Sequence, residues 1–318
     1  NARNKEKLIS EIRKAEYIFV ADLFLEDYTG GAELTTEAIF NHNDYSEKIC
    51  KIKCSELDLQ ILQEGTLKNW VFFNFAQLNK DLIPTIVANL NYSVVEYDYK
   101  FCKYRSTEKH LEAENSECDC HNQVHGKMVS AFLYAADNIF WMSQGQRDFY
   151  VKIFPFLENK SNYVISSCFT NENLDVLKKL RQNKDREDKW LVVGSSSWIK
   201  GTIETENKLK VEGKEYDVVY NLPHDQLLEK FSNYKGFAFL PLGKDTCPRT
   251  VIEAKLAGCE LIINENVQHK SESWFVDDVE KVDQYLRSNV EKFWKVIENG
   301  NSKIQTISGY TTTRNCID

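Results

Sequence analysis

The sequence contains no apolar run that approaches the roughly 20 residues of a transmembrane helix. Its longest apolar segments, residues 17–25 and 70–75, have the length of a β-strand. The first seven residues include three charged side chains near the start of the chain and a fourth at residue 7, and no long apolar segment follows them, so a signal peptide is not expected. Internal repeats and low-complexity segments are also lacking. We therefore expect a soluble globular protein with no transmembrane segment.

An excess of positive charge is lacking as well. The chain has 40 Lys and Arg residues against 48 Asp and Glu residues, which gives a formal net charge of −8 and a pI of about 5.5. Such a chain has no overall attraction to phosphate polymers, so a nucleic acid is not the expected partner. One local basic group, Lys100 with Lys103 and Arg105, keeps that alternative open.

Several catalytic motifs are missing. The sequence has no Gly-x-Ser-x-Gly turn, no Walker loop and no His-Glu-x-x-His pair, which argues against the enzyme classes that depend on them. Four histidines have no convincing catalytic partner nearby in the sequence, and we expect surface or capping roles for them: His42, His110, His224 and His269.

The nine cysteines are an odd number, and several lie within apolar runs. A chain of 318 residues does not need disulfides for stability. We therefore expect a reducing, cytoplasmic environment in which most thiols are buried, with peripheral association at a membrane as an open alternative.

Short apolar segments alternate with amphipathic ones along the chain, which predicts βαβ units and parallel sheets in an α/β fold. The length favours two Rossmann-like domains. We expect an N-terminal domain over residues 1–168, a second domain over residues 169–275, and C-terminal helices over residues 276–318 that return to the first domain. Strands are expected at 17–23, 49–54, 70–75, 93–97, 138–142, 163–167, 190–194, 217–220, 237–241 and 260–263.

Three segments at the ends of expected strands carry the functional signal. Gly30-Gly31-Ala32-Glu33 follows the first strand, and tandem glycines let the backbone approach a ligand, with the amides of the next helix as donors. Lys200-Gly201 follows a Ser/Gly-rich turn that suits a diphosphate.

The third segment, residues 240–259, is the most informative. Asp245 or Thr246 can cap a helix that begins near Thr246, and Glu253 follows Asp245 by about two helical turns. The carboxylate of Glu253 is expected to be reachable by solvent. Carboxylates accept hydrogen bonds from sugar hydroxyls, and helix-start amides donate to phosphate.

Together these segments resemble the family 4 retaining glycosyltransferases of the GT-B fold, in which two Rossmann-like domains face each other across a cleft. The resemblance implies that Gly30 and Gly31 form the turn facing the donor phosphate and the acceptor. It implies that Lys200 binds the diphosphate, with the amides of Arg249 and Thr250. Asp245 and Glu253 match the two acids of the Glu-x7-Glu motif, which hold the transferred sugar and the ribose respectively. Leu222-Pro223 resembles the loop that contacts the nucleobase.

The resemblance further implies a hexosyltransferase that uses a UDP- or GDP-sugar, retains the anomeric configuration and needs no catalytic metal. Lys200, Asp245 and Glu253 are then the expected catalytic residues, and the acceptor is a glycan or another hydroxyl compound. Ser195 and Cys247-Pro248 depart from the family pattern, so diphosphate binding is expected to rely on Lys200 and Arg249. The alternatives are a sugar transferase acting on modified DNA, a nucleotide-sugar epimerase or hydrolase, and a binding protein without catalysis.

A separate group of cysteines and histidines has the residue types of a structural zinc site. The candidate ligands are Cys102, Cys118, Cys120 and either His121 or His125. The charged segment 103–117 between them lacks a core pattern, so a metal would explain how it is ordered. Free thiols on a loop are the alternative.

Overall fold

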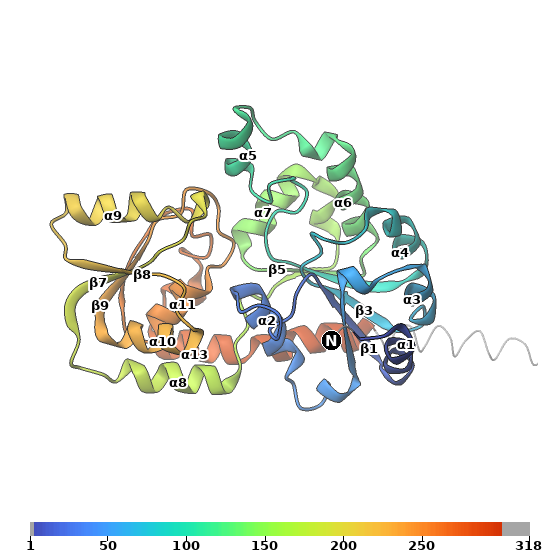
Figure 1. The fold of residues 1–318 in the computed structure, drawn as a ribbon, viewed down its shortest axis with the longest axis horizontal. Helices are drawn as coiled ribbons and strands as arrows, with labels where there is room; N and C mark the ends of the chain where they lie inside the picture. The colour runs from blue at the N-terminus through green and yellow to red at the C-terminus, as the bar shows by residue number, and fades with distance from the viewer. Residues whose placement is uncertain (1–2, 301–318) are drawn as a thin grey trace, which may run out of the picture.

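The computed structural model describes residues 3–300, which form two α/β lobes, each built on a parallel sheet (Figure 1). The first sheet has six strands in the order β2-β1-β3-β4-β5-β6, and the second has four in the order β10-β9-β7-β8. Each of the ten expected strands is present, with ends that differ by up to three residues.

The strands of the first sheet are β1 (Tyr17–Ala21), β2 (Ile49–Lys53), β3 (Asn69–Phe72), β4 (Asn91–Glu96), β5 (Asn138–Trp141) and β6 (Asn162–Val164). Both faces of this sheet are covered, because successive residues of β1 alternate between two cores. Phe19 packs in one core, and Ile18 and Val20 pack in the other. The helices of this lobe are α1 (Lys5–Lys14), α2 (Gly31–Phe40), α3 (Leu59–Glu64), α4 (Ile83–Asn89), α5 (Thr107–Glu114), α6 (Val124–Ala135) and α7 (Gln144–Ile153).

The second lobe contains β7 (Glu187–Val193), β8 (Tyr216–Val219), β9 (Tyr234–Phe239) and β10 (Glu260–Ile263). Its helices are α8 (Asn171–Arg181), α9 (Thr202–Val211), α10 (His224–Asn233) and α11 (Arg249–Leu256). The chain enters this lobe after β6 through residues 165–170, which lead directly into α8.

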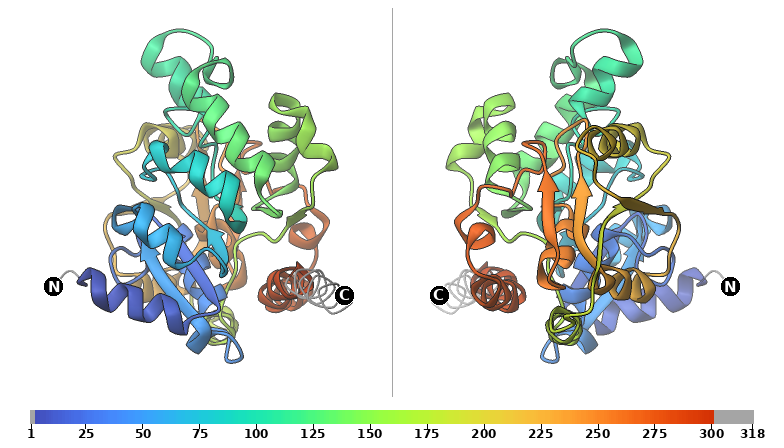
Figure 2. Two further views of the ribbon diagram at one scale, coloured as in Figure 1. Left: turned by 90° about the vertical axis from the view of Figure 1, so that its right-hand side faces the viewer. Right: turned by 90° about the vertical axis from the view of Figure 1, so that its left-hand side faces the viewer.

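The chain then returns to the first lobe. After α12 (Ser273–Val276) and α13 (Val279–Arg287), a last helix over residues 289–300 runs along one side of the first lobe (Figures 1 and 2). Trp294 anchors it, because its ring stacks on Tyr45 with a centroid distance of 3.9 Å and its Nε1 donates to the carbonyl of Ile39 at 3.0 Å. Residues of both lobes therefore share one continuous core.

Within residues 3–300 no helix has the length and apolar character needed to cross a membrane. The described cysteines are free, and all but Cys118 are buried, as expected for thiols that pack as small apolar side chains. Cys316 lies outside the described residues.

Strand order determines where a site can form. In the first sheet β2 and β3 lie on opposite sides of β1, and in the second sheet β8 and β9 lie on opposite sides of β7. Ligands in parallel sheets bind at such switch points, beyond the carboxyl ends of the strands. The glycine turn follows β1, Lys200 follows β7 and Asp245 follows β9.

Candidate active site

A cleft of about 1560 Å³ is lined by residues of both lobes. The eight residues expected to bind the donor all line it: Gly30, Gly31, Lys200, Leu222, Asp245, Arg249, Thr250 and Glu253. They come from segments that together span more than 200 positions of the sequence. The fold therefore brings the three sequence segments to one place.

The glycine turn is the first lobe's contribution. Gly30 is the N-cap of α2, and a Cβ on Gly31 would lie 3.5 Å from the Cβ of Arg249, so this turn faces the start of α11 closely. A Cβ on Gly30 would lie 2.6 Å from Oε2 of Glu33, which shows how near this carboxylate lies to the helix start. Burial raises the pKa of Glu33, while hydrogen bonds from the amides of Glu33 and Gly30 lower it. The amides of α2 thus already have an acceptor in Glu33.

Lys200 and Asp245 meet in the second lobe. Nζ of Lys200 lies 3.0 Å from Oδ2 of Asp245, and this carboxylate raises the pKa of the lysine. Their contact follows from the sheet, because β7 and β9 are neighbours and each residue lies in the loop after its strand. Gly201 sets the lysine's position: its φ is +63°, and a Cβ there would lie 2.1 Å from the carbonyl oxygen of Leu240.

The helix that carries Glu253 begins at Arg249, and the expected start near Thr246 is wrong. Its N-cap is Pro248, which supplies no side-chain hydrogen bond. Thr246 instead donates through Oγ1 to the carbonyl of Tyr97 in the first lobe at 2.6 Å, and Asp245 pairs with Lys200. The first amides of an α-helix have no acceptor within it, so Arg249 and Thr250 present theirs to the cleft.

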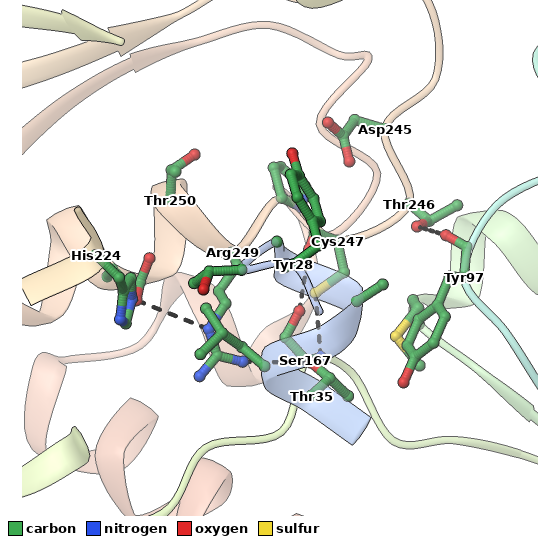
Figure 3. Close-up of a pocket in the computed structure, with 18 of the residues that line it drawn as sticks. Tyr28, Thr35, Tyr97, Ser167, His224, Asp245, Thr246, Cys247, Arg249 and Thr250 are labelled. Carbon is green, nitrogen blue, oxygen red and sulfur yellow. Dashed lines mark hydrogen bonds and ion pairs between the residues drawn. The ribbon is translucent and has the colours of Figure 1, made fainter. Parts of the chain in front are cut away.

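Arg249 connects the two lobes (Figure 3). It is 5% exposed, and its Nη1 donates to the carbonyl of Cys168 at 2.6 Å and to Oγ1 of Thr35 at 3.3 Å. Burial lowers the pKa of Arg249, and Glu253 acts against this. Its Nε and Nη2 are buried and make no hydrogen bond within residues 3–300. A buried charge is costly unless it is paired, and the carboxylate of Glu253 beside Nε supplies the opposite charge.

Glu253 is more enclosed than the sequence suggested. It is 2% exposed, and its Oε2 lies 2.6 Å from Nε2 of His224 and 3.7 Å from Nε of Arg249. The expectation of a solvent-reachable carboxylate is therefore wrong. The expectation that His224 has only a surface or capping role is wrong too, because His224 lines the cleft and holds Glu253.

The expected basic group on the first lobe is not a free positive surface. Lys100 is 2% exposed, and its Nζ lies 2.7 Å from both Glu96 and Asp98. Nε of Arg105 lies 2.6 Å from Asp98, and Lys103 pairs with Glu114. These charges are compensated locally, which removes the feature that had kept a nucleic-acid partner open.

The cysteine–histidine group is partly as expected. Cys102, Cys118 and Cys120 converge, but the histidine beside them is His110. His125 instead has its Nε2 2.7 Å from the carbonyl of Lys100, and His121 is not within the group. His110 was expected to have a surface or capping role, yet it is 5% exposed.

No family model matches the chain, and no curated protein matches it significantly in sequence. Two solved structures share its fold with a TM-score of 0.50. One is an alpha-glucosyltransferase in complex with UDP and a 13-mer DNA containing an HMU base, 9% identical, with 88% of this chain and 89% of that chain covered. The other is a sucrose-phosphate synthase from Thermosynechococcus elongatus, 12% identical, with 92% of this chain and 100% of that chain covered. The fold is that of the GT-B glycosyltransferases, as expected.

Proposed function

We propose that this protein is a glycosyltransferase that moves a hexosyl group from a UDP-sugar to a hydroxyl acceptor. The observation that carries the proposal is the convergence of Lys200, Asp245, Glu253 and the uncapped start of α11 in one interlobe cleft. Such a site combines donors for a diphosphate with acceptors for sugar hydroxyls. The UDP bound to one structure of the same fold is consistent with it.

The diphosphate has two sets of donors in this proposal. The amides at Arg249 and Thr250 bind one part, because a helix start favours anions. Lys200 and the guanidinium of Arg249, which both line the cleft, supply positive charge. During transfer the bond between the anomeric carbon and the phosphate oxygen breaks, and these groups stabilise the negative charge that develops on the leaving diphosphate.

The two acids divide the remaining contacts. Glu253, held by His224, accepts hydrogen bonds from the ribose, and Leu222, which lines the cleft, contacts the base. Asp245 accepts from the transferred sugar, and its ion pair with Lys200 links the sugar end of the site to the diphosphate end. We propose transfer with retention at the anomeric carbon, with the leaving phosphate assisting the attacking hydroxyl.

The acceptor enters from the first lobe, past the glycine turn. Modified DNA is the less favoured acceptor, because the basic residues Lys100 and Arg105 are already paired with Glu96 and Asp98. An epimerase or hydrolase would act on the donor alone, so the reaction without acceptor distinguishes these alternatives.

The test has two stages. Calorimetry with UDP and GDP measures nucleotide affinity, and tighter binding of UDP is expected. Release of UDP from UDP-hexoses is then followed with and without a panel of sugars, lipid-linked sugars and hydroxymethylated DNA, and acceptor-dependent release is expected. Absence of binding to both nucleotides would refute the donor site, and donor turnover that no acceptor accelerates would favour the hydrolase.

A further inference from the structure

Three thiols and one imidazole meet beneath α5, away from the catalytic groups described above. The metal-binding atoms of Cys102, His110, Cys118 and Cys120 all lie within 4.8 Å of one another. Cys102, His110 and Cys120 are at most 5% exposed, and Cys118 is partly exposed. The function proposed for the cleft uses none of these four side chains.

The spacing of these atoms matches a tetrahedral ion. Nδ1 of His110 lies 3.7 Å from Sγ of Cys102 and 3.6 Å from Sγ of Cys120. Bonds of about 2.3 Å to sulfur and about 2.0 Å to nitrogen at a tetrahedral angle place sulfur and nitrogen roughly 3.6 Å apart. A disulfide needs sulfurs only about 2 Å apart and would leave the third thiol and the imidazole without a role.

The histidine is oriented for metal binding by its outer nitrogen. Nε2 of His110 lies 3.2 Å from Oε2 of Glu114, so its Nδ1 faces the thiols. Glu114 is fixed in turn by the hydroxyl of Tyr104 at 3.0 Å and by its ion pair with Lys103. A carboxylate behind a ligating imidazole is the usual second layer of a zinc site, because it sets the ring's tautomer and orientation.

We propose that Cys102, His110, Cys118 and Cys120 hold one structural Zn²⁺ through three thiolate sulfurs and Nδ1 of the histidine. Three soft ligands and one imidazole favour Zn²⁺ over the harder cations, and four protein ligands leave no open position for catalysis. Binding of one ion releases the three thiol protons to solvent.

The position of the site indicates what the ion does. His110 lies on α5, two residues after Glu108, whose Oε1 is 2.6 Å from Nζ of Lys244 in the second lobe. Nζ of Lys109 lies 5.5 Å from the ring centre of Trp198, also in the second lobe. Figure 1 shows α5 projecting at the edge of the first lobe. The ion therefore fixes the helix that contacts the donor-binding lobe beside Asp245.

Metal content tests the site directly. The full chain, purified without a histidine tag or chelator, is expected to contain one zinc per molecule by elemental analysis. Cys118→Ser and His110→Ala are expected to lose it. The matched controls Cys54→Ser, a buried thiol in the same lobe, and His125→Ala are expected to keep it.

A second measurement covers the case in which the ligand variants fail to fold. The wild-type chain reconstituted with Co²⁺ should show thiolate-to-cobalt charge transfer and the visible bands of a tetrahedral ion. Thiol titration of the denatured, unreduced protein should recover all nine cysteines. A metal content near zero with no cobalt spectrum would overturn the proposal, as would two missing thiols or zinc loss in the His125→Ala control.

Discussion

Nζ of Lys200 lies 3.0 Å from Oδ2 of Asp245, although 45 positions separate the two residues. This ion pair joins the segment after β7 to the segment after β9, at the point where the second sheet reverses its strand order. An ammonium group has three donors, so Lys200 can bind a diphosphate in the cleft while it remains paired with Asp245.

Replacing Lys200 with Met should weaken donor binding and leave the fold intact, because the side-chain stem is kept and the side chain is 44% exposed. A charge-assisted hydrogen bond contributes about 1.5–3 kcal/mol, so UDP affinity should fall roughly 10- to 100-fold. Calorimetry measures this, with Lys210→Met on the exposed face of α9 as the matched control. Equal affinity in wild type and the Lys200 variant would contradict the phosphate assignment.

Asp245→Asn should separate turnover from nucleotide binding. By the proposed function Asp245 contacts the sugar, so turnover should fall about 10- to 100-fold. UDP, which lacks the sugar, should bind at least as tightly as to wild type, because Lys200 no longer has a competing carboxylate. Steady-state kinetics and calorimetry on one preparation measure both effects, and a variant that loses UDP affinity while keeping turnover would reverse the assigned roles.

Glu253→Gln should reduce stability as well as donor affinity. The carboxylate is 2% exposed and bonded to His224, and its loss leaves the buried cation of Arg249 with less compensation. We expect the free energy of unfolding to fall by about 1–3 kcal/mol. Denaturant unfolding measures it, with the exposed Glu229→Gln on α10 as control. A double-mutant cycle with His224→Ala should show coupling between the two sites, and additive effects would argue against the pair.

The strands could be predicted because each is a short β-branched or aromatic run, and burial on both faces of a parallel sheet requires such runs. The same alternation predicted two parallel sheets. The loops after β1, β7 and β9 could be predicted as ligand-binding loops because glycines, a lysine and acidic residues follow the strands there. Strand order could not be predicted, yet it brings Lys200 to Asp245.

Side-chain partners were the part that the sequence could not provide. His224 is the first residue of α10, directly after the N-cap Pro223, and the packing of α10 against α11 brings it to Glu253. His121 and His125 were the two histidines predicted as the fourth ligand, and neither belongs to the group that the structure forms; His121 lies in a 3-10 turn over Cys120–Asn122. His110 reaches the cysteines because α5 forms, and the charged composition of α5 gave no sign of it.

His269 should make stability depend on pH, because it is fully buried and the expected surface or capping role is wrong. Burial lowers its pKa to about 3 from 6.5, and neither ring nitrogen has a hydrogen bond within residues 3–300. Between these values the unfolded chain binds a proton that the folded chain does not, so stability is full above pH 6.5 and falls as the pH decreases. This residue contributes up to about 1.4 kcal/mol per pH unit. In His269→Leu the free energy of unfolding should fall less steeply as the pH decreases, because one fewer proton is taken up on unfolding. Denaturant unfolding at several pH values measures this, and parallel pH curves for the two proteins would contradict the assignment.

Gly201 and Gly213 offer a matched test of how the Lys200 loop is positioned. Both have left-handed backbones, with φ of +63° and +67°. A Cβ at Gly213 would meet nothing within 4 Å, whereas one at Gly201 would lie 2.1 Å from the carbonyl oxygen of Leu240. Gly213→Ala should therefore cost only the left-handed strain of about 1–2 kcal/mol. Gly201→Ala should cost more in denaturant unfolding, because the backbone must move as well. That movement displaces Lys200, so UDP affinity should fall only in the Gly201 variant, and equal stability and affinity in the two variants would show that this contact does not hold the loop.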